Sequence, residues 1–550
     1  MKIYGHKSFN SFFIALVFFC TSYFLYAQKA KINVPPGSAQ LLHGKIVDEA
    51  GDPLIAQVQV WYYSFTEVVS SFTSDEVKGR TDNLIGMTYS TIDGFYSIKV
   101  PADTLLLIIS KGPEWELIIK KIIVLENEFG GLENNATLKH LYNLQKLGWY
   151  GGDTHLHSVF SDGRQTPTEI ANALKGVGLS WGILTDHNTI AGAKEWSSCK
   201  SKDFITIIGN EITSEASFSS IENGYGHMNQ IFIDTLNGAD PNNPNIWARA
   251  IFNDHNDVQN IINKTHEQKG MLVINHPYQN WDWSGRFKSW GEVKNFDAIE
   301  IWNCEPPHSL TTSTFDPNLT NRNTWAVQSW FSFLNCGIKI PGLAGSDNHD
   351  NTGVNSYPKG EYFWNTTVGN PRSYAYINNL NENEIKSALM QSNLFLTSGF
   401  GPLLLAEVNH KKPGEILESI DNEVKVSIEV LSNYPLLKNE GAIRIIYNGE
   451  VVKSIATAST MTFHDSVAIE IDKDGWIVVE VFGEWPMFAI TNPIFVDVPP
   501  FGDWPVREWV EPNDVKLWNK FKSHPNITIP DGPSNWKNSK YIFNLLEESL

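Results

Sequence analysis

The sequence predicts a multidomain protein of class α/β plus β, in which a central α/β domain is flanked by an N-terminal and a C-terminal β-sandwich. Three observations support this prediction. The chain has 550 residues, more than one domain usually holds. Short apolar runs separated by turn residues precede and follow a middle region in which such runs alternate with helical patterns. Hydrophobic residues make up 42% of the chain and charged residues 19%, as in ordinary folded proteins.

Residues 1–27 have the pattern of a secretory signal peptide. Lys2 and Lys7 supply the positive charge, residues 12–19 the apolar segment, and Ala27 the small residue before a cleavage site. We expect an exported protein, periplasmic, secreted or on the cell surface, with no stable membrane span after cleavage. An uncleaved anchor is the alternative reading of the same segment.

Residues 41–145 are expected to form the N-terminal sandwich. Strand-like runs cover residues 44–47, 56–62, 95–100 and 105–110, with turn signals between them. The stretches GKIVDEAGDPL and TIDGFYSIKVP resemble carboxypeptidase-regulatory-like domains, which implies an accessory module without chemistry of its own.

Residues 146–400 alternate strand-like and helical patterns, as in a barrel or a doubly wound α/β domain. One helix start is well defined. Thr166, Pro167 and Glu169 combine an N-cap, a proline in the first turn and a capping glutamate. Ile170, Ala173, Leu174 and Val177 then follow at helical spacing, which predicts a helix packed on a sheet.

Residues 401–500 return to strand-like runs and predict the C-terminal sandwich. These runs are residues 424–430, 442–447, 468–471 and 476–482, and Asn448-Gly449 predicts a hairpin turn. Residues 501–550 form a Trp- and Pro-rich tail, which we expect to wrap the preceding domains or to lie partly loose.

Charge and cysteine content exclude several function classes. The net charge is −19 and no basic cluster occurs, which argues against nucleic acid as a partner. We expect a small-molecule substrate instead. Outside residues 1–27 the cysteines are Cys199, Cys304 and Cys336, without a CxxC pair. One disulfide is compatible with this number, but the sequence does not identify the pair.

The central region carries a series of side chains that can bind metals, nearly all directly after an apolar run. They are His155, His157, Asp162, Asp186, His187, Glu211, His227, His276, Glu300, Asp347 and His349. In a parallel α/β barrel, loops from different strands converge at the carboxyl ends of the strands, so these side chains are expected to meet.

The spacing within the series favours metal binding. His155 and His157 lie two residues apart, so an extended backbone places both rings on one face, ready for a single ion. Asp347 and His349 repeat this spacing. Glu211 has two oxygens and can bridge neighbouring ions. Mixed nitrogen and oxygen ligands without thiolates suit zinc, manganese or iron.

Each feature alone is weak, because paired strand histidines and turns such as SDG are common without function. The prediction rests on the whole series within one domain. Glu300 is interpreted as a group that supports the ligands. Four further histidines fall in helical or loop patterns and are interpreted as ordinary solvated residues: His140, His255, His266 and His308.

The ordered motifs HxH, SDG, TDHN, GxE, GHMN, NHP and DxH resemble the PHP (polymerase and histidinol phosphatase) superfamily. Together with residues 488–496 (FAITNPIFV), they are similar to its CehA/McbA-type metallohydrolases. The resemblance covers about residues 149–500 and implies a distorted (β/α)7 TIM-like barrel with two or three divalent transition metal ions. It implies one ion at His155, His157, Glu211 and Asp347, a second at Glu211, His227 and His276, and a third at Asp162, His187 and His349.

The predicted activity is hydrolysis by a metal-activated water. The superfamily implies a phosphoester substrate, and the narrower branch implies carbamate or aryl-ester hydrolysis as the alternative. We expect Glu211 to be essential, Asp186 to orient an imidazole or carry a proton, and Arg164 to bind phosphate, with Arg286 as a second cation. The aromatic segment 278–290 could line a substrate site or simply pack over the domain. A different class of protein, a catalytically silent glycan-binding protein, is the remaining alternative.

Overall fold

The computed structural model describes part of the 550-residue chain. The described residues are 39–63, 84–126, 130–213, 225–234, 254–278, 287, 289–290, 292–304, 306–307, 322–351, 367–438, 441–458, 460–484 and 487–502. The predicted signal peptide, Arg286 and nearly all of the C-terminal tail lie outside these ranges.

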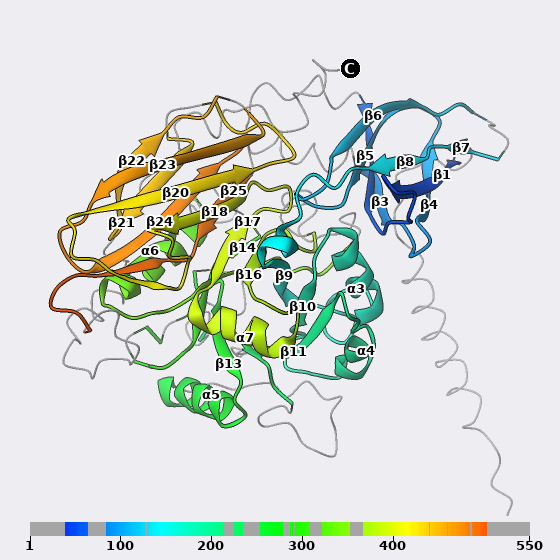
Figure 1. Ribbon diagram of the computed structural model, residues 1–550. Coiled ribbons are helices and arrows are strands. Elements are labelled where there is room, and N and C mark those ends of the chain that lie inside the picture. Colours follow the sequence, from blue (N-terminus) through cyan, green and yellow to red (C-terminus); the bar gives the residue numbers. More distant parts are fainter. Residues whose placement is uncertain are drawn as a thin grey trace, which may run out of the picture.

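The N-terminal region consists of two small sheets that enclose their own apolar core (Figure 1). One sheet has the order β4-β1-β7, with β8 also paired to β1, and the other has the order β3-β2-β5-β6. The strands are β1 (Ala39–Asp48), β2 (Gln57–Tyr62), β3 (Leu84–Tyr89), β4 (Phe95–Pro101), β5 (Thr104–Ser110), β6 (Ile118–Ile123), β7 (Leu132–Glu133) and β8 (Ala136–Leu138).

The central region is built on seven hydrogen-bonded neighbours in the order β15-β14-β13-β12-β11-β10-β9. All neighbours are parallel except β12, which runs antiparallel to both β11 and β13. The strands are β9 (Trp149–Leu156), β10 (Trp181–Leu184), β11 (Ile205–Thr213), β12 (His227–Ile231), β13 (Met271–Asn275), β14 (Ala298–Asn303) and β15 (Gly342–Gly345).

This sheet curls until its first and last strands meet. A parallel bridge joins Leu156, the last residue of β9, to Asn348 after β15, and the Asp347 amide donates to the His155 carbonyl at 3.0 Å. Gly345 permits this approach, because a Cβ there would lie 2.5 Å from the His155 Cβ. Strand β9, which carries His155, and strand β15, which ends just before Asp347, therefore lie side by side.

Five helices are described in the central region: α3 (Pro167–Gly176), α4 (Ala193–Ser198), α5 (His255–Glu267), α6 (Arg322–Asn335) and α7 (Glu382–Gln391). The predicted helix start at Thr166 is confirmed. Its hydroxyl accepts from the Glu169 amide, and the Glu169 side chain accepts from the Thr166 amide. Ile170, Ala173 and Leu174 are buried against the sheet.

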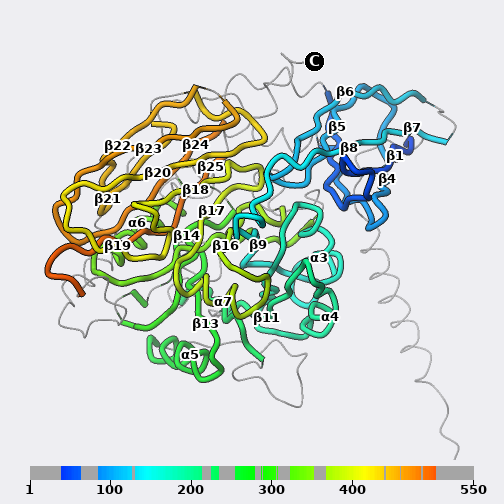
Figure 2. Tube along the Cα trace, viewed as in Figure 1, coloured from blue at the N-terminus to red at the C-terminus, as the bar shows by residue number. Residues whose placement is uncertain are grey.

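The C-terminal region forms two layers, but one of them continues the central sheet (Figures 1 and 2). From β9 the sheet runs through β16 (Arg372–Tyr376) and β17 (Leu394–Thr397) to β25, β24, β21 and β22. The separate layer is β18-β20-β23. The bounds are β18 (Leu403–Val408), β19 (Ile416–Glu418), β20 (Glu423–Leu431), β21 (Ile443–Tyr447), β22 (Glu450–Ile455), β23 (Thr462–Glu470), β24 (Gly475–Phe482), β25 (Phe488–Thr491) and β26 (Ile494–Asp497).

The predicted hairpin at Asn448-Gly449 is confirmed. Tyr447 pairs with Glu450, and the two turn residues have φ values of 52° and 90°.

The predicted fold class holds only in its coarser form. The described chain is a mostly β, multidomain protein with few helices. A regular alternation of strands and helices fails at β12, because β11 and β13 are both its antiparallel partners, so the sheet departs from a simple barrel of βα units. Among the described helices, none is both long and apolar enough to cross a membrane.

A short segment after β5 connects all three regions. The Lys111 ammonium donates to the carbonyls of Ile55 at 2.8 Å and Lys175 at 2.6 Å, which ties the N-terminal region to the end of α3. The Asn433 side chain, between β20 and β21, donates to the Trp115 carbonyl at 3.0 Å. The N-terminal region is therefore hydrogen-bonded to both neighbours.

Candidate metal centre

The strand order explains why distant residues meet. His155, Glu211 and Asp347 lie at or just after the carboxyl ends of strands of the central sheet. His227 begins β12 instead, but β12 is antiparallel, so His227 pairs with Thr213 on β11 and Asn275 on β13 at the same edge. All nine predicted ligands are therefore brought to one edge of the sheet: His155, His157, Asp162, His187, Glu211, His227, His276, Asp347 and His349.

The first cluster consists of four buried ligand atoms. The Nε2 atoms of His155 and His157 each lie 3.2 Å from Oε2 of Glu211. They lie 3.4 Å and 3.0 Å from Oδ1 of Asp347. These four atoms are close enough to one another to hold a single ion.

The second oxygen of Glu211 faces a different pair of histidines. Oε1 lies 2.9 Å from Nδ1 of His227 and 3.1 Å from Nε2 of His276. Because Oε2 belongs to the first cluster, the Glu211 carboxylate is placed to connect two adjacent ion sites. His187 also reaches this carboxylate, with Nδ1 3.1 Å from Oε2.

The third cluster surrounds Asp162. Its carboxylate lies 3.2 Å from Nε2 of His349 and 3.6 Å from Nε2 of His187. His157 joins this group through its other nitrogen, because Nδ1 lies 3.8 Å from Asp162. The ring of His157 stacks on that of His349 at a centroid distance of 4.2 Å, so the first and third clusters share a wall.

The donor atoms fit divalent ions. Nε2 of His155, Nε2 of His157, Oε2 of Glu211 and Oδ1 of Asp347 are buried and have no hydrogen-bond partner of normal geometry among the described residues. Buried polar atoms are nearly always satisfied, so four such atoms pointing at one another require an explanation. A bound cation supplies it, and imidazole with carboxylate oxygen suits zinc, manganese or iron.

A set of buried polar groups orients the ligands. Oε1 of Glu300 lies 2.9 Å from Nδ1 of His155, and Oε2 accepts from the His276 amide at 3.0 Å. The Asn303 side chain donates to Glu300 at 3.0 Å and to Asp347 at 3.3 Å. A carboxylate behind a ligand histidine fixes the ring and its tautomer, with Nε2 left for the metal.

The electrostatics follow from burial and from the opposed charges. Burial lowers the pKa of His155 and His157, but the carboxylates of Asp347 and Glu211 outweigh it, raising the pKa of His155 well above its usual value and that of His157 to about 10. Burial alone would raise the pKa of Glu211 and Asp347, yet the neighbouring histidines hold both well below the usual range. Burial lowers the pKa of His187 to about 3, which keeps that ring neutral.

The backbone is strained at two of the ligands. His276 has a φ of 24° and Asp347 a φ of 52°, in the left-handed region that side chains with a Cβ seldom adopt. Strained residues concentrate at functional sites, where the surrounding structure fixes them. From these positions His276 reaches Glu211 at 3.1 Å and Asp347 reaches His157 at 3.0 Å.

Asp186 binds the turn that carries Asp162. Its carboxylate accepts from the Ser158 amide at 2.6 Å, the Ser158 hydroxyl at 2.7 Å and the Ser161 hydroxyl at 2.8 Å. These bonds hold the loop that carries Asp162. They go to serines of the turn and not to an imidazole, and the expected role of Asp186 in orienting an imidazole or carrying a proton stays a prediction.

Arg164 lies at the edge of the site. Its side chain is 49% exposed, with Nη1 3.6 Å from Asp350, and its amide donates to the His349 carbonyl at 2.9 Å. Its backbone therefore adjoins the third cluster, and its half-exposed guanidinium pairs with Asp350.

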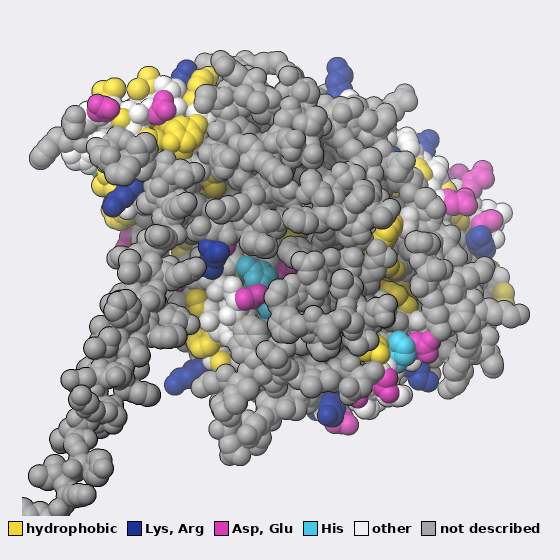
Figure 3. Space-filling model, turned by 180° about the vertical axis from the view of Figure 1, so that it is seen from behind, with side chains coloured by type: hydrophobic (Ala, Val, Ile, Leu, Met, Phe, Trp, Pro, Cys, Tyr) yellow, Lys and Arg dark blue, Asp and Glu magenta, His cyan; other side chains and the backbone are white. Residues whose placement is uncertain are grey.

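The metal centre opens to solvent on one side. The side chains of Asp162 and His349 are 47% and 37% exposed, whereas those of His155, His157 and Glu211 are at most 1% exposed. Figure 3 shows histidine and acidic side chains together at the surface, with a basic side chain and hydrophobic side chains close by. The third cluster therefore forms the mouth, and the first cluster forms the floor.

The structure also describes the three cysteines and part of the aromatic segment 278–290. Cys199, Cys304 and Cys336 are free thiols, so they form no disulfide with one another. Phe287 and Trp290 are buried in the core and do not line the mouth, which favours the packing interpretation for the described part of segment 278–290.

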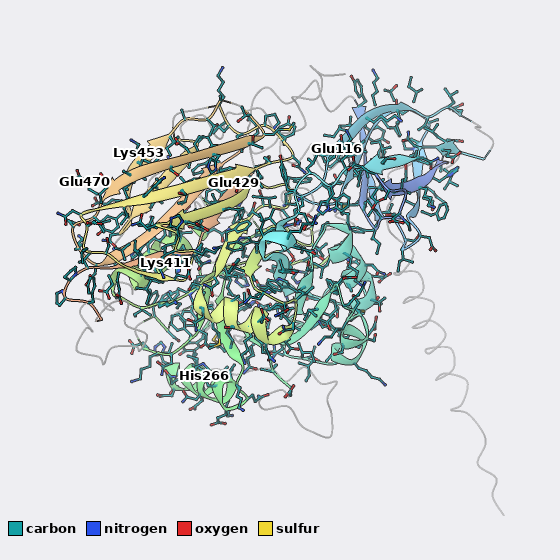
Figure 4. The ribbon with its side chains drawn as sticks, viewed as in Figure 1. Glu116, His266, Lys411, Glu429, Lys453 and Glu470 are labelled. Atoms are coloured by element: carbon teal, nitrogen blue, oxygen red, sulfur yellow. The ribbon has the colours of Figure 1, made fainter. Side chains whose placement is uncertain are left out.

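The histidines interpreted as ordinary lie outside the three clusters. His140 stacks on Trp115, His255 contacts Ser289, and His266 pairs with Asp297. His266 is seen on α5 in Figure 4. His308 lies outside the described residues.

Sequence reasoning missed Asn275, Asn303 and Thr213. Asn275 donates to Glu211 at 3.0 Å, and the Thr213 hydroxyl lies 2.5 Å from Nδ1 of His187. Asn275 and Asn303 each end an apolar run, as the ligands do, so strand-end position was the available signal.

No protein-family model and no curated protein sequence matches this chain. Among solved structures, it is similar to a two-domain protein from Bacteroides vulgatus containing a predicted PHP-like metal-dependent phosphoesterase. That match has 16% identity and a TM-score of 0.33, and it covers 60% of this chain and 90% of the other. A putative metal-dependent phosphoesterase from Bifidobacterium adolescentis matches at 14% identity and a TM-score of 0.27, over 43% and 95% of the two chains.

An amidohydrolase from Chromobacterium violaceum matches at 16% identity and a TM-score of 0.25, over 36% of this chain and 87% of the other. TM-scores this low do not define the fold of this chain, and the metal-binding character of the site rests on the distances given above.

Proposed function

We propose that this chain is a metal-dependent hydrolase that cleaves phosphoesters. The observation that carries the proposal is the convergence of four buried ligand atoms without a hydrogen-bond partner among the described residues, from His155, His157, Glu211 and Asp347. The other oxygen of Glu211 faces His227 and His276, which supports a second adjacent ion. Asp162, His187 and His349 would hold a third at the mouth.

Bound divalent ions would acidify a water molecule and neutralise negative charge on the substrate. The chain's own residues contribute orientation and charge. Glu300 fixes the ring of His155, and Asn303 holds both Glu300 and Asp347 in place. Burial of the first cluster excludes bulk water and strengthens every charge interaction there.

A phosphoester is favoured over other bonds because of the cation at the mouth. Phosphate oxygens are bound well by guanidinium groups, and Arg164 is half exposed beside the third cluster. A carbamate or aryl ester is the second candidate, since the exposed apolar residues of the loop that carries Asp162 suit a substrate with an apolar group. The proposals of a CehA/McbA-type branch and of a TIM-like barrel rest on the order of the motifs.

The test is a substrate panel on metal-loaded protein. Phosphomonoesters, phosphodiesters, carbamates and aryl esters are compared for the wild type and Glu211→Ala, with zinc, manganese and iron supplied in turn. We expect phosphomonoester or phosphodiester turnover that requires metal and is lost in Glu211→Ala. Turnover of carbamates or aryl esters alone would favour the second candidate. Metal binding with no turnover of any class would favour a silent binding protein.

We also propose that the protein is exported, on the strength of the signal-like pattern of residues 1–27. Cell fractionation of the tagged full-length chain tests this: the mature protein should appear outside the cytoplasm, shortened at its N-terminus. Full-length protein found only in the cytoplasm would contradict it.

A further inference from the structure

We propose that Val159 and Phe160 form an apolar subsite beside the metal centre, which binds an alkyl or aryl group attached to the substrate phosphate. This inference rests on the proposed function and deepens it. The two side chains are 47% and 36% exposed, and they lie on one turn between the ligands His157 and Asp162.

The turn that carries Val159 and Phe160 lies next to the open end of the metal centre in the chain. Asp162 and His349 form the open end of the centre, whereas the first cluster is buried beneath them. A substrate must approach over this end. Groups attached to its phosphate therefore pass beside the turn that carries Asp162, while Arg164 lies on the continuation of the same loop.

The turn is fixed at both ends, so its exposed side chains are held in place. Ser158 and Ser161 donate to the buried Asp186 carboxylate. On the other flank, the Gln165 side chain donates to Asp350 at 3.1 Å, and the Val159 amide donates to the Gln165 carbonyl at 2.9 Å. A loop held this firmly presents a preformed surface, which reduces the ordering cost of binding.

The chemistry of the mouth is amphiphilic. Metal ligands and Arg164 attract an anion, and the turn between His157 and Asp162 carries exposed apolar side chains at two consecutive positions where polar residues are usual. This combination suits a phosphate ester with an apolar substituent better than a sugar phosphate or a nucleotide.

The probe is a series of alkylphosphonates: ethyl-, butyl- and hexylphosphonic acid, titrated calorimetrically into zinc-loaded protein. Burying one methylene fully contributes about 0.8 kcal/mol, or about fourfold in affinity, and one-sided contact about half that energy, or about twofold. From ethyl to hexyl, which adds four methylenes, we expect affinity for the wild type to rise by roughly fifteenfold.

Val159→Ser and Phe160→Ser should each flatten this dependence on chain length while leaving ethylphosphonate affinity within about twofold. Ile420→Ser is the matched control, because Ile420 is 78% exposed in the C-terminal region. It should keep the full dependence. The zinc content of each variant verifies that the loop still holds Asp162. If Phe160→Ser loses zinc, the subsite is tested by comparing Val159→Ser with the wild type.

Wild-type affinity that does not vary with chain length, or an unchanged dependence in Val159→Ser and Phe160→Ser, would overturn the subsite. Absence of any phosphonate binding would overturn it as well. Metal-dependent turnover of ethyl phosphate tests the proposed function separately. Chain-length-dependent binding without turnover would retain the subsite and reject the phosphatase, whereas turnover without chain-length dependence would do the reverse.

Discussion

At the scale of single residues, the geometry of the metal centre depends on buried side chains that hold the predicted ligands in place. Glu300 lies behind His155 and also accepts from the His276 amide, so one buried carboxylate orients ligands of two clusters. The sequence predicts that Glu300 supports the ligands. An acidic residue at a strand end can also form a salt bridge within its own sheet, and the sequence alone does not distinguish the two roles. The two contacts of Glu300 depend on tertiary placement and could not be read from spacing.

Glu300→Gln should lower zinc affinity by about 10–100-fold, since an amide can present the wrong polar atom to His155 and removes the charge that raises its basicity. Competition with a chelator measures this. Glu114→Gln is the control, because Glu114 is also buried but binds Leu144 and Tyr374 away from the centre. Equal zinc affinity in wild type and Glu300→Gln would contradict the orienting role.

Asp186→Asn should loosen the turn that carries Asp162. The substitution replaces one accepting carboxylate oxygen by an NH2 group, which cannot accept the hydrogen bonds that Ser158 and Ser161 donate. We expect the third ion to be lost selectively, so that the metal count per chain falls by about one while the first cluster stays filled. Elemental analysis after dialysis against fixed zinc gives the count. Loss of all ions together, or of none, would show that Asp186 does not support the third cluster.

At the scale of elements, the sequence predicted strand ends and one capped helix well, because alternating apolar runs and capping residues are local signals. The direction of β12 was not predicted, because nothing in the GHMN stretch distinguishes an antiparallel strand from a parallel one. The continuity of the sheet from β17 to β25 was also missed. Strands this far apart in the chain, as in the pair Leu396 and Ile490, leave no local sequence pattern.

Closure of the sheet between β9 and β15 depends on Gly345. A Cβ there would lie 2.5 Å from the His155 Cβ and 2.6 Å from Oε1 of Glu300. Gly345→Ala should therefore displace His155, destabilise the protein by roughly 1–3 kcal/mol and weaken zinc binding. Thermal unfolding with and without zinc measures both effects. A variant with unchanged stability and zinc affinity would show that the strands can separate without cost.

At the scale of the whole molecule, polar contacts hold the three regions together. Lys111 lies partly buried between the N-terminal region and α3, where desolvation lowers its pKa to about 8 and Glu114 opposes the shift. Unfolded, its pKa returns to about 10.4. Between these values the unfolded chain binds the additional proton, so stability should rise as pH increases from about 8 to 10.

The predicted gain is at most about 1.4 kcal/mol per pH unit, and Lys111→Met should remove it. Urea unfolding of both proteins at pH 8, 9 and 10 provides the comparison, because all other titrating groups are common to the two chains. Parallel stability curves for the wild type and Lys111→Met would contradict a lowered pKa of Lys111 at this junction.

The central claim is that Glu211 joins two adjacent metal ions at one edge of the sheet. The most direct measurement is metal stoichiometry by elemental analysis, after saturation with zinc and dialysis, for the wild type and Glu211→Ala. Glu211 contacts His155 and His157 through one oxygen and His227 and His276 through the other. We predict two or three ions per wild-type chain and the loss of both ions that share Glu211 in the variant. A wild type that binds no zinc, or a variant that retains the full count, would contradict the account.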